Sequence, residues 1–283
     1  MIGRIKNILF PTDFSDIANN AMRFAVAIAK RQQAKLHIFH AVIPEYLPVV
    51  GDVSLGVVYD GYEEVEKMNS KKLKNLAISL AATNHLKVES HTKIGNVAES
   101  IDQLAKELQI DLIVMGTHGT SNMREFFIGS NAYSTVKNSH CPVLTIPANS
   151  TSTDFSTVLF PVRNVKGVDE KYLSIINILK ANRSKVLLLG VAHFNDFDSF
   201  DFISDKVNQL SLKMHEDGIE VKNRNQYCEN IANFILDYTY ATKPDLLVIN
   251  ANIDTDWKRY FLGSFAQRIV NNAPCPVLNI KPQ

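Results

Sequence analysis

Residues Asp111 to Ile146 decide the fold of this chain. They read Asp-Leu-Ile-Val-Met-Gly-Thr-His-Gly, then nine residues, then Gly-Ser-Asn, a helical run and Cys-Pro-Val-Leu-Thr-Ile. The run from Leu112 to Met115 ends at Gly116 and has the continuous apolar character of a buried parallel strand. Gly129-Ser130 opens the next helical pattern. The two glycine clusters should therefore meet above the carboxyl end of a strand.

The glycines of this stretch predict a cradle for phosphate groups. A residue without Cβ can take a positive φ, and it lets backbone N–H groups approach an anion closely. The helix that starts at Ser130 adds unpaired N–H donors and a favourable dipole, and the Ser130 hydroxyl can add a hydrogen bond. Such a site would hold an anion without a dedicated lysine.

The rest of the first half alternates short apolar runs with helical patterns. Strands are expected at residues 5–10, 36–42, 87–93, 112–115 and 143–146. With helices between them, these runs predict right-handed crossovers and an α/β fold with a doubly wound, mostly parallel, five-stranded sheet. In such sheets a ligand lies beyond the carboxyl ends of the strands, where the chain order reverses.

The whole pattern occurs twice. Ile-Leu-Phe-Pro at residues 8–11 recurs as Val-Leu-Phe-Pro at 158–161, and Cys-Pro-Val-Leu at 141–144 recurs at 275–278. This internal duplication in register predicts two tandem domains of the same fold class. The first copy is longer, chiefly in the stretch from Ile43 to Tyr62. That stretch has no clean period and is interpreted as a lid, a partner contact or a mobile loop.

The duplication sets the expected domain boundaries. The first domain should span residues 1–147 and the second 155–283, with a Ser/Thr-rich linker at 148–154. An uncovered apolar strand edge invites aggregation. The short runs 143–146 and 277–280 are therefore expected to pair about a pseudo-twofold axis as an internal pseudo-dimer.

The glycine spacing also resembles that of a known family. Gly116, two residues, Gly119, nine residues and Gly129-Ser130 match the ATP-binding signature of the universal stress proteins, and residues 8–15 resemble that family's first strand and turn. The similarity covers the whole chain as two copies. It implies an adenine nucleotide hydrolase-like, Rossmann-like fold and a role in stress response or regulation.

The resemblance further implies ATP as the ligand, and a magnesium or manganese ion could accompany its phosphates. The residues implied to bind the nucleotide are Pro11, Thr12, Asp13, Ala41, Met115, Gly116, His118, Gly119, Gly129, Ser130 and Asn131. The departure is Ala41, which is smaller than the valine usual there.

Several of these residues have a plainer interpretation. Asp13 would hold the ribose through its carboxylate, or it would simply cap the first helix. Thr12, Ala41 and Met115 would contact the adenine or only pack. His118 would donate to a phosphate or be solvated. Arg124, in the nine-residue spacer, would reach the terminal phosphate or face solvent.

The second copy has lost most of the cradle. Asp13 is matched by Arg163, Gly116 by Asn250 and Gly119 by Ile253, while Gly263-Ser264 is retained. A β-branched residue where the backbone should approach a phosphate argues against the same geometry. One nucleotide site per chain is expected, in the first half, with the second half structural or regulatory.

Composition excludes several other classes. Thirty basic and twenty-nine acidic residues leave a net charge of +1, which predicts neither nucleic acid nor an anionic membrane as partner. No signal peptide or membrane-spanning run is found, so a cytoplasmic location is expected. The three cysteines show no Cys-x-x-Cys pair and are interpreted as packing residues. His37 and His40 would point to opposite faces of a strand, so no dedicated metal site is expected.

Three functions remain open. The first is an ATP-binding regulatory protein that alters a partner surface, with the protein partner and any further homodimer unspecified. The second is a slow ATPase or phosphate-transferring enzyme that uses His118 or Arg124. The sequence contains no Gly-x-Ser-x-Gly, no Gly-Lys-Ser and no evident Cys-His pair, so no catalytic residue is named. The third is a nucleotide-independent scaffold that binds a protein or an apolar ligand.

Overall fold

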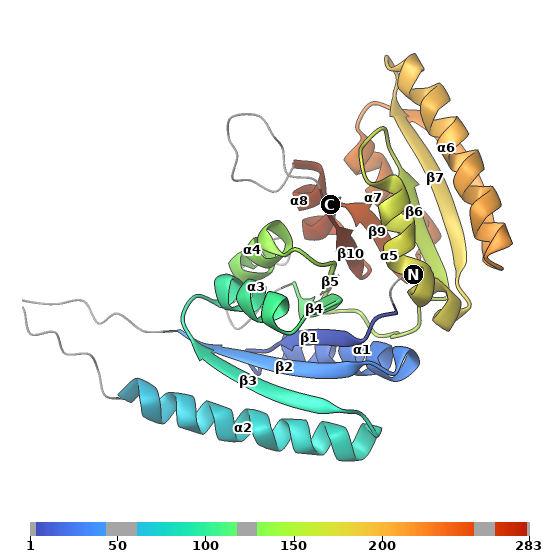
Figure 1. Ribbon diagram of the computed structural model, residues 1–283. Helices are drawn as coiled ribbons and strands as arrows, with labels where there is room; N and C mark the ends of the chain where they lie inside the picture. The colour runs from blue at the N-terminus through green and yellow to red at the C-terminus, as the bar shows by residue number, and fades with distance from the viewer. Residues whose placement is uncertain (1–3, 44–60, 118–128, 252–263, 282–283) are drawn as a thin grey trace, which may run out of the picture.

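The computed structural model describes residues 4–43, 61–117, 129–251 and 264–281. Two units of five strands and four helices follow one another along the chain (Figure 1). The first contains β1 (Asn7–Pro11), α1 (Asp16–Gln32), β2 (Lys35–Val42), α2 (Gly61–Asn84), β3 (Val88–Ile94), α3 (Val97–Glu107), β4 (Leu112–Gly116), α4 (Ser130–Asn138) and β5 (Val143–Ile146). The second contains β6 (Thr157–Val162), α5 (Val168–Asn182), β7 (Lys185–His193), α6 (Phe197–Glu216), β8 (Glu220–Cys228), α7 (Ile231–Thr242), β9 (Leu246–Asn250), α8 (Ser264–Asn272) and β10 (Val277–Ile280).

The strands form one continuous sheet in the order β3-β2-β1-β4-β5-β10-β9-β6-β7-β8. Read outward from the middle, both halves have the same order, which confirms the predicted doubly wound fold and its duplication. Neighbouring strands within each half are parallel. The two predicted five-stranded sheets thus share hydrogen bonds across their inner edges and become a single ten-stranded sheet.

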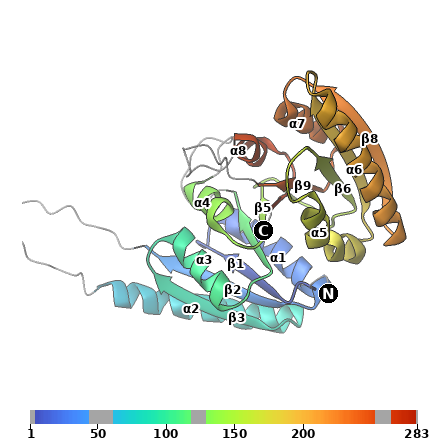
Figure 2. The same cartoon turned by 45° about the horizontal axis from the view of Figure 1, so that its top comes forward.

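Helices cover both faces of this sheet. One core contains the inward side chains of α1, α2, α5 and α6, and the other contains those of α3, α4, α7 and α8. Figures 1 and 2 show the result at β3, where α2 and α3 lie on opposite sides of the strand. The continuous apolar runs of the central strands follow from this arrangement, because residues on both sides of each strand are buried.

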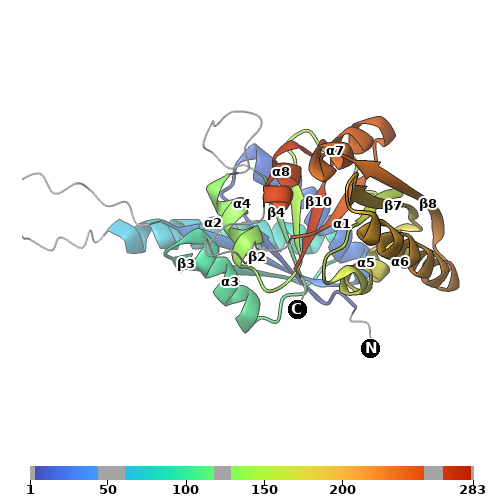
Figure 3. The same cartoon turned by 90° about the horizontal axis from the view of Figure 1, so that it is seen from above.

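The two halves meet at an antiparallel pair of strands. Leu144 of β5 lies opposite Leu278 of β10, and these leucines occupy equivalent places in the two Cys-Pro-Val-Leu segments. The pseudo-twofold relation therefore passes between them, as the duplication predicts. Figure 3 shows the two halves on either side of this join, with α2 and β3 toward one end of the molecule and α6 and β8 toward the other. The pair is buried, and Asn279 Nδ2 donates to the Val143 carbonyl at 3.1 Å across it.

The predicted linker lies along α1. Asn20 Nδ2 donates to the carbonyls of Ala148 at 3.1 Å and Ser150 at 3.0 Å, and Arg23 donates to that of Thr151 at 2.9 Å. Arg31 continues the series at the Thr153 carbonyl, at 2.7 Å. These donors occupy one side of α1 and fix the path of the chain from the first half to the second.

Several features discussed from the sequence lie outside the described residues, among them Ile253 and Gly263 of the second copy. In the first half, they are His118 and Gly119, the spacer arginine Arg124, and residues 44–60 of the long irregular stretch. Helix α2 already begins at Gly61. Within the described parts of the chain, no helix combines the length and the apolar character needed to cross a bilayer.

Candidate functional site

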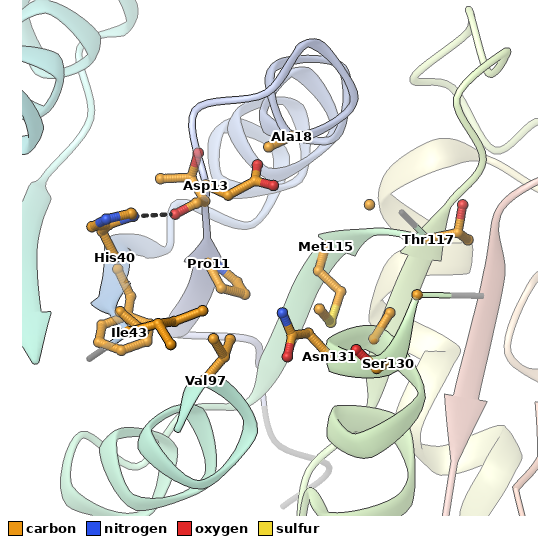
Figure 4. Close-up of a pocket in the computed structure, with 16 residues that line it drawn as sticks. Pro11, Asp13, Ala18, His40, Ile43, Val97, Met115, Thr117, Ser130 and Asn131 are labelled. Carbon is orange, nitrogen blue, oxygen red and sulfur yellow. Dashed lines mark hydrogen bonds between the residues drawn. The ribbon is translucent and has the colours of Figure 1, made fainter. Parts of the chain in front are cut away.

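A crevice opens at the carboxyl ends of β1 and β4. The strand order reverses there, because β1 pairs with β2 on one side and with β4 on the other. The crevice encloses about 910 Å³ of space, including the part open to solvent. Figure 4 shows its walls, which come from the ends of β1, β2 and β4 and from the first turns of α3 and α4. This position is the usual ligand site of a doubly wound sheet.

A tight turn after β1 forms one wall. The Thr12 N–H donates to the Phe39 carbonyl at 2.8 Å, and the Thr12 hydroxyl accepts from the Phe14 N–H at 2.9 Å. Phe14 itself takes a left-handed conformation with φ of 64°, which is uncommon for a residue with a bulky side chain. Its ring packs 4.8 Å from that of His40, and Lys72 Nζ lies 3.9 Å above it. These contacts fix the turn that carries Asp13.

Asp13 does not cap the first helix. The N-cap residue of α1 is Ser15, whose hydroxyl accepts from the Ala18 N–H at 3.1 Å. The Asp13 carboxylate instead accepts from the Ser15 N–H at 3.0 Å, across two residues, and the residue is exposed. This short bond orients the carboxylate at the mouth of the crevice, where a hydroxyl-bearing ligand group could reach it.

The first turn of α4 forms the opposite wall. Its N-cap residue is Gly129, which supplies no side-chain hydrogen bond, and no acidic residue lies in the turn. The Gly129 N–H donates to the Thr117 carbonyl at 2.7 Å, which holds the helix start against the end of β4. Ser130 and Asn131 are exposed in this turn and line the crevice. An uncapped amino terminus with these polar side chains suits an anion.

The floor between the two walls is mostly apolar. Met115 projects from β4 and is only 6% exposed, while Ala41 and Phe39 line the crevice from β2. Val97, at the start of α3, completes this side. His40 is held away from the floor because its Nδ1 contacts the Thr12 carbonyl at 2.8 Å. A flat apolar ring could be accommodated between these side chains.

The crevice therefore brings together most of the predicted site. Nine of the eleven predicted residues line it, and His118 and Gly119 lie outside the described residues. The same walls also contain residues that the sequence did not assign to this site: Ala18, Phe39, His40, Ile43, Val97, Thr117 and Ala132. Three of the seven, His40, Thr117 and Ala132, are next to a predicted residue in the chain. For the others, the convergence of strand ends at one edge of a parallel sheet was the signal available to find them.

The corresponding place in the second half is filled by its own side chains. Asn250, which matches Gly116, is 2% exposed and donates through Nδ2 to the Gly167 carbonyl at 2.9 Å. Arg163, which matches Asp13, places its guanidinium carbon 3.5 Å from the ring centre of Phe265 in the first turn of α8. A phosphate could reach the backbone at this position only if the buried amide of Asn250 and the stacked guanidinium of Arg163 moved away.

Comparison with known proteins gives a consistent result. The model of the universal stress protein family matches residues 4–147 and 173–281. A universal stress protein of Methanocaldococcus jannaschii is 31% identical over 144 residues, which cover 50% of this chain and 81% of the relative. The universal stress protein YxiE of Bacillus subtilis is 34% identical over 146 residues, 49% of this chain and 97% of the relative.

Solved structures match both halves together. A universal stress protein from Archaeoglobus fulgidus superposes with a TM-score of 0.80 at 15% identity, covering 99% of this chain and all of its own. At this identity the likeness concerns the fold alone. It shows that the arrangement of two duplicated halves in one chain occurs in another protein.

Proposed function

Because this chain belongs to the universal stress protein family, we propose that its first half binds ATP in the crevice between β1 and β4 and acts in stress response or regulation. The phosphates would lie at the first turn of α4, near Gly116 and Gly129, and the ribose would lie against Asp13. The adenine would rest on the apolar floor formed by Met115 and Ala41.

One observation carries this proposal. The uncapped, acid-free first turn of α4 faces the same crevice as the Asp13 carboxylate, with an apolar floor between them. An anion-binding end, an apolar middle and a carboxylate that can accept from hydroxyl groups match the three parts of a nucleotide in order. A magnesium or manganese ion would accompany the phosphates as a companion of the ligand.

We propose binding and not efficient turnover. Among the described residues that line the crevice, the side chains that carry an acidic or basic group are Asp13 and His40. Both belong to the wall formed by β1 and β2, and the proposed phosphate site lies at α4. Neither is placed to activate a water molecule at the terminal phosphate.

The second half would act as a structural and regulatory partner, with residues 1–147 and 155–283 as the two domains. Lys281, just after β10, donates through Nζ to the carbonyls of Lys137 and, at 2.9 Å, Ser139 at the carboxyl end of α4. Burial lowers the pKa of this lysine to about 8. The helix whose amino end would hold phosphate is thus attached at its other end to the second half.

Isothermal titration calorimetry of the full chain with ATP tests the proposal. Asp13→Ala should weaken binding by about 10- to 100-fold, since hydrogen bonds to a charged acceptor contribute roughly 1.5–3 kcal/mol each. Gly119→Val should abolish binding, because the added methyl groups would occupy the approach of the phosphate. Asp198→Ala, which removes an exposed carboxylate from α6 in the second half, is the matched control.

The proposal fails if ATP does not bind, or if Asp13→Ala and Gly119→Val both bind with the affinity of the wild type. An ATP hydrolysis assay on the same samples, with His118→Ala as a variant, separates binding from turnover. Nucleotide that co-purifies with the wild type and not with Asp13→Ala would support the same assignment without added ligand.

A further inference from the structure

A second cluster of side chains with ligand chemistry lies at the outer edge of the first half. It consists of His37 on β2 and of Glu89 and His91 on β3, the edge strand of the sheet. The parallel register places His37 beside Glu89, and places Phe39 beside His91. All three side chains therefore project from the same face of the sheet, the face covered by α3 (Figure 1).

The ligand atoms of this cluster lie close together. His37 Nδ1 is 3.1 Å from His91 Nε2 and 3.7 Å from Glu89 Oε2. One ligand atom from each of the three residues falls within a common separation of 4.8 Å. Ligands of a tetrahedral zinc ion, at about 2.0–2.2 Å from the metal, are separated from one another by roughly 3.3–3.6 Å. The two shorter distances already bracket this value.

We propose that His37, Glu89 and His91 form a binding site for a divalent transition-metal ion, with zinc as its natural occupant. Two imidazoles and one carboxylate form a ligand set that suits zinc, and the fourth position would be taken by water. The ion would connect β2 to the edge strand β3. This inference is independent of the ATP proposal.

The surroundings of His37 support a ligand role. The imidazole is 2% exposed, and its Nε2 lies 3.5 Å from Asn7 Oδ1. With the proton on Nε2 directed to this amide oxygen, Nδ1 keeps its lone pair toward His91 and Glu89. A partner of this kind on the second ring nitrogen is the usual companion of a metal-bound histidine. His91 is half-buried and Glu89 is exposed, so an ion could enter from the β3 edge.

One neighbouring charge opposes the ion. Lys35 Nζ forms an ion pair with Glu89 Oε1 at 2.5 Å, which leaves Oε2 on the side of His37. The ammonium group repels a cation and competes for the carboxylate, whereas Glu107 of α3 adds a negative charge that acts on His91. The site should therefore bind zinc more weakly than it would without Lys35.

Sequence spacing could not have revealed this cluster. His37 and His40 lie on one strand and point to opposite faces, and the structure directs His40 to the Thr12 carbonyl. The partner of His37 is instead His91, 54 residues away along the chain. Only the pairing of β2 with β3 brings the two rings together.

The test is calorimetric titration of zinc chloride into the full chain after removal of any polyhistidine tag and dialysis against a chelator. No nucleotide is added, because ATP itself binds zinc. We expect one ion per chain and a rise in the thermal unfolding midpoint. Glu89→Gln keeps shape and removes charge at an exposed position, and His91→Ala removes a ligand outright. These variants should bind zinc at least about 10-fold and 100-fold more weakly, respectively.

Two further variants make the test specific. Lys35→Met should bind zinc about tenfold more tightly, since a like charge next to the ion is removed. His215→Ala removes an exposed histidine from α6 and should leave zinc binding unchanged. The proposal is overturned if the wild type does not bind zinc, so that His37 and His91 form only a hydrogen bond. It is also overturned if Glu89→Gln or His91→Ala binds as the wild type does, if Lys35→Met binds no more tightly, or if His215→Ala binds more weakly.

Discussion

A negative charge placed at the start of α4 should affect stability and ligand binding in opposite directions. Ser130 is the first residue of α4, is exposed, and follows an N-cap glycine without a side-chain hydrogen bond. Aspartate at this position would interact favourably with the unpaired N–H groups and with the helix dipole. The same carboxylate would stand where the proposed phosphates bind. Ser130→Asp therefore separates a role in folding from a role in anion binding.

The two effects can be estimated. An acidic residue in the first turn of a helix contributes about 0.3–1 kcal/mol, so the thermal midpoint of the ligand-free protein should rise by roughly 1–3 °C. Two unit charges about 5 Å apart at an effective dielectric constant of 20 repel by about 3 kcal/mol. Because Ser130 is exposed, solvent and salt reduce this repulsion to roughly 1.5–3 kcal/mol, which corresponds to a loss of ATP affinity of about 10- to 100-fold.

The assay combines thermal unfolding without ligand and calorimetric titration with ATP. Ser130→Ala removes the hydroxyl without adding a charge, and it should lower the affinity for ATP by about tenfold or less. Ser264, the exposed first residue of α8, is the equivalent position in the second half. Ser264→Asp should leave ATP affinity unchanged. If Ser130→Asp binds ATP within threefold of the wild type, the phosphates do not lie at α4 and the reasoning is refuted.

Three further predictions concern the folded chain itself. Leu278 is buried in the strand that joins the halves, and Leu278→Ala should lower the free energy of unfolding by about 2–4 kcal/mol in urea titrations. The control Leu212→Ala, at an exposed position on α6, should change it by less than about 0.5 kcal/mol. Burial and the nearby Arg163 lower the pKa of Lys171 well below its ordinary value of 10.5. Between these two values the unfolded chain binds more protons than the folded one, so the free energy of unfolding should rise with pH until about 10.5. This rise in the free energy of unfolding is at most about 1.4 kcal/mol per pH unit, and Lys171→Met should remove it. If urea titrations give the wild type and Lys171→Met the same change of unfolding free energy with pH, the prediction is wrong. Burial raises the pKa of Cys141 to about 11 and that of Cys275 to about 12, so a disulfide reagent should label these thiols only after unfolding.

Much of the fold could be read from the sequence because each strand is a short apolar run next to a helical period. The segment 143–146 was placed correctly to the residue, since Pro142 and Pro147 bound it on both sides. Helix α2 begins at Gly61, so the last two residues of the stretch from Ile43 to Tyr62, which has no clean period in the sequence, are helical. The join between the halves was also predictable, because two short apolar strands at equivalent places each leave an edge that must be covered.

The crevice that forms the candidate site was predictable to the extent that it depends on the backbone. Glycine spacing and a strand-turn motif point to residues at strand ends, and parallel pairing brings strand ends to one edge. Side-chain contacts between strands carry no such local signal. The stacking of Phe14 on His40 and the approach of His37 to His91 depend on sheet register, which one sequence without its pairing does not reveal. The same holds for Arg163, whose partner Phe265 lies more than 100 residues along the chain.

The two halves differ from each other at the strands that join them. At the join, Thr145 and Asn279 occupy equivalent places, yet Asn279 Nδ2 donates to the Val143 carbonyl while the Thr145 hydroxyl donates to that of Val277. Two different side chains thus donate across the pair, whereas two first halves would place identical threonines there. Because β5 and β10 use each other's edge, the sheet ends at β3 and β8. Strand β8 carries exposed charged residues, which disfavour further pairing at that edge.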